Sequence, residues 1–409
     1  MSRRIGSCSR REFLVSAGVG VAALALVSGC GPSPAATPTA TPMPEATAAP
    51  PSPEPTVVPG LTPTAISPSL DEKIGQMIMV GFRGLELWEG NPILEDLRER
   101  HIGGVVLFDY DVPTQTRLRN VCSPEQVTAL CAALQTAAGG SLLIAVDQEG
   151  GHIARLKERY GFPATLSEQE LGSADDLSAT RKNAETIATT LKAAGFNLNL
   201  APVVDLNLNP DNPIIGQLGR SFSADSAVVT RHAGEVIRVH HENGVLTTLK
   251  HFPGHGSSKE DSHLGFVDVT DSWQEIELQP YKDLIAAGLV DAVMTAHIFN
   301  AHLDPELPAT LSRPIINGLL REQLGFDGVV ISDDMQMGAI RDHYGFEAAI
   351  QHAIEAGVDI LAIANNSVFD PTVAAQAISV IKGLLRDEVI TPERIDQSYA
   401  RIARLKARL

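Results

Sequence analysis

Short runs of Val, Ile and Leu recur along the chain from residue 70 onward and alternate with longer stretches of helical spacing. Each run is almost continuously apolar, which is typical of parallel strands buried on both faces. Eight such strands separated by helices predict a closed (β/α)₈ barrel of the TIM type. The runs are Gln76–Phe82, Gly104–Phe108, Leu142–Gln148, Leu198–Asp205, Thr247–Phe252, Ala292–Phe299, Val329–Asp334 and Ile360–Asn365.

A doubly wound open sheet would also alternate strands and helices. No Gly-x-Gly-x-x-Gly motif follows the first apolar run, and this absence favours the barrel.

Residues 1–30 have the pattern of an export signal. The segment Ser9–Leu14 contains two adjacent arginines and resembles a bacterial twin-arginine signal, and the apolar stretch Val15–Val27 follows it. Leu26–Cys30 resembles a lipobox, in which Cys30 would be acylated and become the first mature residue. An uncleaved membrane anchor is the alternative. Both hypotheses place the rest of the chain outside the cytoplasm, attached to the cell membrane.

The next segment, residues 31–68, is rich in Pro, Thr and Ala and almost lacks large apolar residues. Such a chain cannot bury a core, so we expect a disordered, extended tether. The catalytic barrel is then predicted over residues 69–409.

Composition narrows the choice of partner. The formal net charge of -17 would repel the phosphates of nucleic acids. A neutral or weakly charged substrate suits such a chain better. Outside the signal, only Cys122 and Cys131 remain, either as two buried free thiols, which we favour, or as a disulfide. No Cys-x-x-Cys pair indicates a zinc site, and no cofactor is expected.

Polar residues stand at or near the carboxyl ends of most predicted strands. Barrel enzymes carry their active sites at that end. Asp147 and Asp333 could alternatively cap the helices that follow them. The strand-end residues are Asp147, Asp205, Lys250, His251, His297, Asp333 and Asn365.

The segment Lys250–Gly256, with sequence KHFPGHG, is the densest group of polar and glycine residues. Its two glycines flank His255 and predict a tight bend. Asp261 and His263 follow, two residues apart, so their side chains would share one side of an extended segment. A carboxylate beside an imidazole fixes its tautomer and raises its basicity, as a proton shuttle requires.

Together these motifs resemble glycoside hydrolase family 3, in particular its β-N-acetylglucosaminidase branch. The resemblance runs in family order from Leu70 to Leu409. The chain ends soon after the eighth strand's helix, without the second αβ domain of larger relatives, which also favours this branch. The matching elements are Leu70–Met77, Asp147–Gly151, Gly219–Phe222, Lys250–Gly256 with Asp261–His263, and Ser332–Met335.

The resemblance implies a role for each motif residue. Asp333 would be the nucleophile of a retaining mechanism, and His263 with Asp261 the acid/base pair. The implied activity removes terminal β-linked N-acetylglucosamine in cell-wall or chitin-type glycan turnover. The residues that would bind the sugar are Asp147, Arg155, Arg220, Lys250 and His251.

Other hypotheses stay open at this point. The His and Asp residues could hold a divalent metal, although the first strand has no His-x-His pair. A β-glucosidase or β-xylosidase of the same family and a lipid-anchored sugar-binding protein are the functional alternatives. His255 is expected to be structural, and His297 to line the pocket or to satisfy a core hydrogen bond. The natural glycan, the acceptor and the oligomeric state are not determined by the sequence.

Overall fold

Eight parallel strands form the centre of the computed structural model, which describes residues 68–409. Along the sheet their order is β10-β1-β2-β3-β4-β5-β7-β9, so strands that follow each other in the barrel sequence are neighbours in space. The strands are β1 (Ile78–Gly81), β2 (Gly104–Val106), β3 (Leu143–Val146), β4 (Leu198–Asn199), β5 (Leu246–Phe252), β7 (Ala292–Thr295), β9 (Val329–Ile331) and β10 (Leu361–Ile363).

The two ends of this sheet meet and close it into a barrel. Ile331 and Ile360 form a parallel bridge between the β9 and β10 segments. The Ser332 amide donates to the Ile360 carbonyl (2.9 Å), and the Ile360 amide donates to the Val330 carbonyl (3.0 Å). The prediction of a (β/α)₈ barrel is therefore confirmed.

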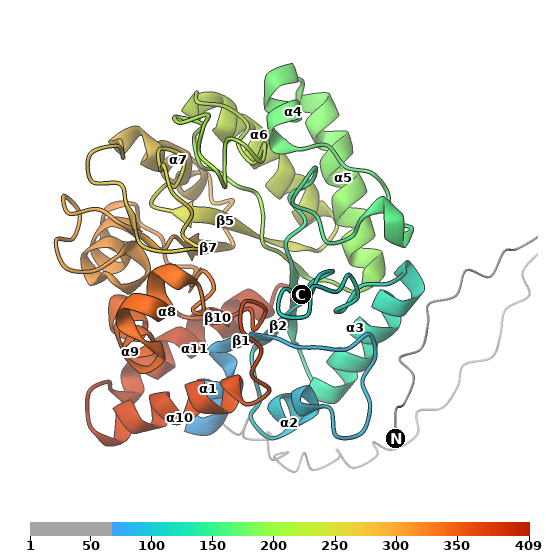
Figure 1. Cartoon of the computed structure of the whole chain (residues 1–409), viewed down its shortest axis with the longest axis vertical. Coiled ribbons are helices and arrows are strands. Elements are labelled where there is room, and N and C mark those ends of the chain that lie inside the picture. Colours follow the sequence, from blue (N-terminus) through green and yellow to red (C-terminus); the bar gives the residue numbers. More distant parts are fainter. Residues whose placement is uncertain (1–67) are drawn as a thin grey trace, which may run out of the picture. The chain divides into compact units, whose positions relative to one another are not determined.

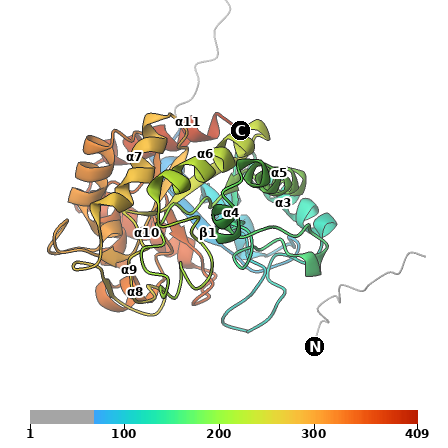
Figure 2. The same ribbon diagram turned by 90° about the horizontal axis from the view of Figure 1, so that it is seen from above.

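Helices surround the strands as a ring in chain order, from blue α1 to red α11 (Figure 1). Seen from the side, long loops in cyan, green and gold lie on the side away from α11 (Figure 2). The α-helices are α1 (Leu70–Gln76), α2 (Pro92–Arg98), α3 (Pro124–Ala138), α4 (Glu168–Ala174), α5 (Leu177–Ala194), α6 (Ser226–Glu242), α7 (Gln279–Ala286), α8 (Gly338–Tyr344), α9 (Phe346–Ala356), α10 (Val373–Arg386) and α11 (Pro392–Lys406). Shorter turns are η1 (Glu158–Tyr160), η2 (Glu275–Leu278) and η3 (Ala309–Leu311), and η4 (Pro314–Gln323) is a π-helix.

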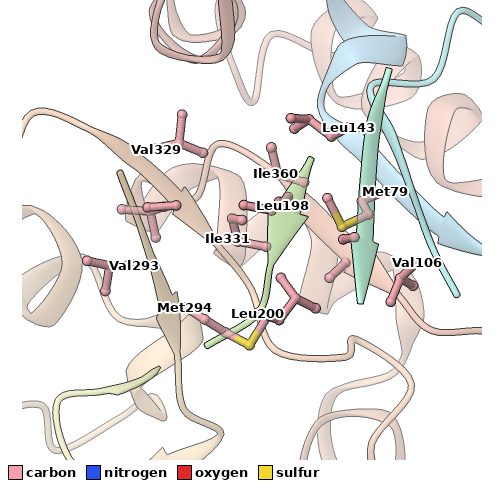
Figure 3. Packing of buried hydrophobic residues seen from close by; sticks show 14 of the residues in the cluster. Met79, Val106, Leu143, Leu198, Leu200, Val293, Met294, Val329, Ile331 and Ile360 are labelled. Carbon is pink, nitrogen blue, oxygen red and sulfur yellow. The ribbon is translucent and has the colours of Figure 1, made fainter. Parts of the chain in front are cut away.

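Apolar side chains from the strands fill the barrel interior (Figure 3). Met79, Leu200 and Met294 point toward one another there, and each is at least 95% buried. Alternate residues of each strand point inward, so the apolar runs of the sequence supply both this interior and the layer beneath the helices.

Two of the predicted strands differ from their sequence runs. β4 covers only two residues of the run Leu198–Asp205, and the rest forms a loop that places Asp205. The sixth run is split, since its last residues form β8 (Ile298–Phe299), which leaves the barrel and pairs with β6 (Val267–Asp268). The strand β6 belongs to the long loop after β5. Its pairing with β8 joins segments that are distant in the sequence, so the local pattern of apolar residues did not predict it.

The predicted export signal, Cys30 and the tether lie outside the described residues. Within residues 68–409, no helix is both long enough and apolar enough to cross a membrane. Cys131 is a buried free thiol, so it does not pair with Cys122. The prediction that both thiols are buried was wrong for Cys122, which is half-buried.

A buried carboxylate stabilises the seam where the barrel closes. Asp359, directly before β10, is fully buried. Its Oδ2 accepts from the Val330 amide (3.0 Å) and from Arg321 (2.7 Å), while Oδ1 accepts from Ser398 (2.8 Å). Arg401 also reaches Oδ1 (3.3 Å). The side chain thus connects β9 to η4 and α11.

We expect Asp359→Ala to lower the free energy of unfolding by roughly 3–5 kcal/mol, because it leaves Arg321, whose side chain is only 10% exposed, without its counter-charge. Denaturant unfolding followed by circular dichroism measures this loss. Asp327→Ala is the matched control. Asp327 also binds arginines of α11, but its side chain is 69% exposed, so its loss should cost less than about 1 kcal/mol. Equal effects of the two variants would contradict the role of the seam.

Candidate active site

One cavity of about 430 Å³ opens where the carboxyl ends of the barrel strands meet. The side chains Met79, Val106, Leu200 and Met294 from the barrel interior also line it. The cavity thus joins an apolar region with a polar one, as small-molecule sites do. All eight sequence-predicted catalytic and sugar-binding residues line it: Asp147, Arg155, Arg220, Lys250, His251, Asp261, His263 and Asp333.

Lys250, on β5, is the central cation of this cavity and is only 2% exposed. Its ammonium group lies 2.8 Å from Asp147 Oδ1 and 2.7 Å from Glu149 Oε1. Burial alone would lower the pKa of Lys250, but the two carboxylates outweigh it and raise that pKa. Lys250 therefore stays charged at the bottom of the site.

Two arginines complete the network of charges. Arg220 binds Glu149 with two parallel hydrogen bonds, from Nε (2.8 Å) and Nη2 (2.7 Å). Arg155 donates to Asp147 (3.1 Å). Burial raises the pKa of Asp147, yet Lys250 and Arg155 together hold it well below the ordinary value. Both carboxylates are therefore ionised and able to accept hydrogen bonds.

Asp205 orients the imidazole of His251, the residue next to Lys250. His251 Nδ1 donates to Asp205 Oδ2 (2.7 Å), which leaves Nε2 facing Arg220 at 3.3 Å. The other Asp205 oxygen accepts from the backbone amide of His255 (2.8 Å). Asp205 is 1% exposed, so this carboxylate fixes both the His251 side chain and the start of the following loop.

Two neighbouring carboxylates at the end of β9 have different environments. Asp333 is half-buried, and the charges of His297, His251 and His263 outweigh burial and lower its pKa. Burial raises the pKa of Asp334 to about 6. Asp334 Oδ1 accepts from the amides of Gln336 (3.1 Å) and Ala364 (2.9 Å), so it stabilises the turn. Asp333 is therefore the carboxylate that stays ionised to lower pH, although both residues line the cavity.

His263 lies on the loop after β5, and its side chain is 56% exposed. Nδ1 donates to Asp261 Oδ1 at 2.7 Å, and the His263 amide binds the same oxygen at 2.9 Å. Burial lowers the pKa of His263, but the Asp261 hydrogen bond and the charge of Asp333 outweigh it, and the net pKa is raised. Nε2 is therefore the free nitrogen, and it carries a proton to higher pH than an ordinary imidazole.

The His263 loop contacts the start of α8. The amides of Gly338 and Ala339 donate to the carbonyls of His263 (3.2 Å) and Ser262 (3.3 Å). A Cβ at residue 338 would lie 3.0 Å from the His263 carbonyl oxygen, so glycine permits this close approach. These contacts hold the exposed imidazole at the cavity.

The family model described as the N-terminal domain of glycosyl hydrolase family 3 matches residues 69–405. The chain belongs to glycoside hydrolase family 3.

Relatives within the family have similar sequences and folds. The chain is 37% identical to a β-hexosaminidase of Stenotrophomonas maltophilia, over 73% of this chain and 86% of that protein. It is 36% identical to β-hexosaminidase A of Pseudoalteromonas piscicida, over 78% of this chain but only 55% of that protein.

Among solved structures, a family 3 β-N-acetylglucosaminidase from a Paenibacillus species superposes with a TM-score of 0.76 at 38% identity. That match covers 84% of this chain and 63% of the Paenibacillus chain. A β-N-acetylhexosaminidase from Beutenbergia cavernae gives a TM-score of 0.75 at 30% identity, over 83% and 99% of the two chains.

Several sequence expectations about this family 3 site can now be compared with the structure. Neither Asp147 nor Asp333 caps a helix, since η1 and α8 begin after Lys157 and Met337. His297 lies outside the cavity lining; it is buried and its Nε2 donates to the Asp334 carbonyl (2.9 Å). Of the two alternatives expected for His297, the structure therefore supports the core hydrogen bond and not a position in the cavity lining.

The bend around His255 forms as the glycines predict. Gly254 has a φ of 119°, in the region that favours glycine, and a Cβ on Gly256 would collide with the Leu206 carbonyl. His255 is buried between the hydroxyls of Ser258 (2.7 Å) and Ser262 (3.2 Å), and burial lowers its pKa to about 4. A neutral imidazole tied to both serines fits the structural role expected for it.

Sequence reasoning gave no site role to Glu149, and it named Asp205 only among the strand-end residues, without a partner or a role. Glu149 lies within the Asp147–Gly151 motif, and the need of Lys250 and Arg220 for a counter-charge was the available signal. For the metal hypothesis, no group of three or more His, Cys, Asp or Glu side chains among residues 68–409 is arranged to hold an ion.

We expect Asp261→Asn to lower the pKa of His263. The substitution removes the negative charge and weakens the hydrogen bond at Nδ1, the two contributions of Asp261 that favour the protonated ring. Titration of the His263 ring protons by NMR measures the shift. Glu260→Gln is the control, because Glu260 is an exposed neighbour without a recorded contact to the ring. An unchanged pKa in the Asp261→Asn protein would contradict the coupling.

Proposed function

We propose that the chain is a retaining β-N-acetylhexosaminidase that removes terminal non-reducing N-acetylglucosamine from cell-wall or chitin-type glycans. One observation carries this proposal. An ionised carboxylate, Asp333, and an exposed imidazole with a raised pKa, His263, line the same cavity. A nucleophile and a proton donor are the two groups that glycoside hydrolysis by retention needs.

In the first step, Asp333 attacks the anomeric carbon as the bond to the leaving oxygen breaks. His263 Nε2 gives its proton to that oxygen, and Asp261 stabilises the ring through Nδ1. In the second step, the neutral Nε2 takes a proton from water, which attacks the anomeric carbon and releases Asp333. The configuration at that carbon is thus retained.

The remaining charges hold the sugar for this reaction. Ionised Asp147 and the cations Arg155, Arg220 and Lys250 present acceptors and donors to the ring hydroxyls, and His251 presents Nε2. Because these groups are already paired with one another, they need little rearrangement when the sugar binds. The names of the relatives support N-acetylhexosamine as the sugar.

The location outside the cytoplasm also belongs to the proposal. Its support is the sequence alone, namely the twin-arginine segment, the lipobox at Cys30 and the Pro-rich tether. A fatty acid on Cys30 of the mature protein, detected by mass spectrometry, is the direct measurement.

A panel of aryl glycosides tests the activity. We expect hydrolysis of the aryl N-acetyl-β-glucosaminide, and much slower hydrolysis of the β-glucoside and β-xyloside. NMR of the first product should show the β-anomer. Asp333→Asn should abolish turnover while leaving sugar binding measurable. Faster hydrolysis of the glucoside or xyloside would favour the alternative specificity, and binding without turnover by the unmodified protein would favour a sugar-binding protein.

The proton donor has its own test. His263→Ala should reduce kcat/KM by roughly 100-fold or more for substrates with poor leaving groups, because these need protonation as the bond breaks. Aryl substrates with acidic leaving groups should lose much less. The slope of log(kcat/KM) against leaving-group pKa measures the difference. Equal losses across the series would remove His263 from the proton-donor role.

A further inference from the structure

A hairpin in the loop between β2 and α3 forms one wall of the cavity. Asp111 and Thr116 pair as an antiparallel bridge at its base. Tyr110 and Val112, on either side of Asp111, are 37% and 51% exposed, and both line the cavity that holds the candidate catalytic residues. Leu118 on the same loop is 44% exposed but lies outside that lining.

Buried charges hold this hairpin in place. Asp111 is 3% exposed and binds Arg83 through two hydrogen bonds, at 2.6 and 2.9 Å. It also accepts from Arg119 (2.9 Å) and from the hydroxyl of Thr114 (2.7 Å). The Arg119 side chain is fully buried, which is unusual for a surface loop. Buried ion pairs therefore fix the base of a loop whose tip is exposed.

The loop after β10, which lies one strand beyond β1 in the barrel, contributes a second clamp. Asn366, in the loop after β10, donates through Nδ2 to the Tyr110 carbonyl (3.1 Å) and accepts at Oδ1 from the Val112 amide (3.2 Å). Arg119 donates to the same oxygen (2.8 Å). The backbone on both sides of Asp111 is thus fixed, and so are the positions from which Tyr110 and Val112 project.

A rigid, exposed apolar wall at a reaction cavity has a clear use. The backbone that carries its side chains is already fixed, so a ligand that contacts them need not also order the loop. An aromatic ring offers a broad flat face. The C–H face of a pyranose ring is apolar and of similar size, so a sugar is a suitable partner for Tyr110.

The charges of the cavity favour a neutral sugar. Within residues 68–409, the Lys and Arg side chains that line it are Lys250, Arg155 and Arg220, and each is paired with a carboxylate. Arg83 and Arg119 behind the hairpin are paired with Asp111. Among the described residues that line the cavity, no Lys or Arg is therefore left unpaired for an anionic leaving group.

We propose that Tyr110 and Val112 form the leaving-group subsite, which binds the second, neutral sugar ring of a β-linked N-acetylglucosamine chain. The inference rests on the proposed glycosidase activity and adds to it the identity of the preferred leaving group, a sugar of a chitin-type oligomer. Tyr110 acts there as a specificity-determining residue that contacts the part of the substrate that departs.

The test compares two substrates of the Tyr110→Ala protein. One is N,N′-diacetylchitobiose, whose second ring would reach the hairpin. The other is methyl N-acetyl-β-glucosaminide, whose leaving group is too small to reach it. We expect kcat/KM for the disaccharide to fall roughly tenfold, mainly through KM, and the methyl glycoside to change less than about twofold. Tyr110→Phe should restore the disaccharide rate, because the ring face is kept.

Leu118→Ala is the matched control and should leave both rates unchanged. Equal losses on the two substrates would overturn the subsite, since they would mean that Tyr110 only positions the reaction centre. No loss on the disaccharide would overturn it too. So would faster hydrolysis of a disaccharide whose leaving sugar carries a carboxylate. Calorimetry measures the binding of both glycosides to Asp333→Asn, with and without Tyr110→Ala. This experiment needs no turnover, so it distinguishes a failure of the subsite from a failure of the proposed activity.

Discussion

The buried ammonium of Lys250 is the interaction on which the site depends. It lies between Asp147 and Glu149, and Glu149 in turn binds Arg220. These four side chains come from the ends of β3 and β5 and from the loop after β4, so one network of charges holds three neighbouring segments at fixed distances. A single unpaired member would carry a large desolvation cost, which makes the arrangement cooperative.

Compared with this buried network, His263, the group that we propose transfers protons, is exposed. His263 is more than half exposed and is attached to the rest of the molecule mainly through Asp261 and through backbone contacts with the start of α8. A group that must first give a proton and then take one benefits from access to water. In the proposed mechanism, the buried charge network orients the sugar and the exposed His263 exchanges protons.

Much of this arrangement could be predicted from the sequence. The apolar runs predicted the barrel, and polar residues at the run ends predicted positions that the barrel brings into one cavity, since parallel strands finish at the same edge. Asp333 and Asp334 were harder to separate, because the difference between them depends on the amides of Gln336 and Ala364. The clamp between Arg119 and Asn366 joins residues 247 positions apart, and no local pattern indicates it. The pairing of β6 with β8 was missed for the same reason.

The side chains Met79, Val106, Leu200 and Met294 belong both to the packed interior of the barrel and to the lining of the cavity. Where these four side chains line the cavity, room for a bulkier ligand would come from truncating one of them, and each truncation would remove contacts that hold neighbouring strands together. Selection for a larger substrate would therefore act on folding stability at the same positions. The packed barrel interior therefore limits the depth of the cavity, and changes in ligand specificity are expected mainly in the loops at its entrance.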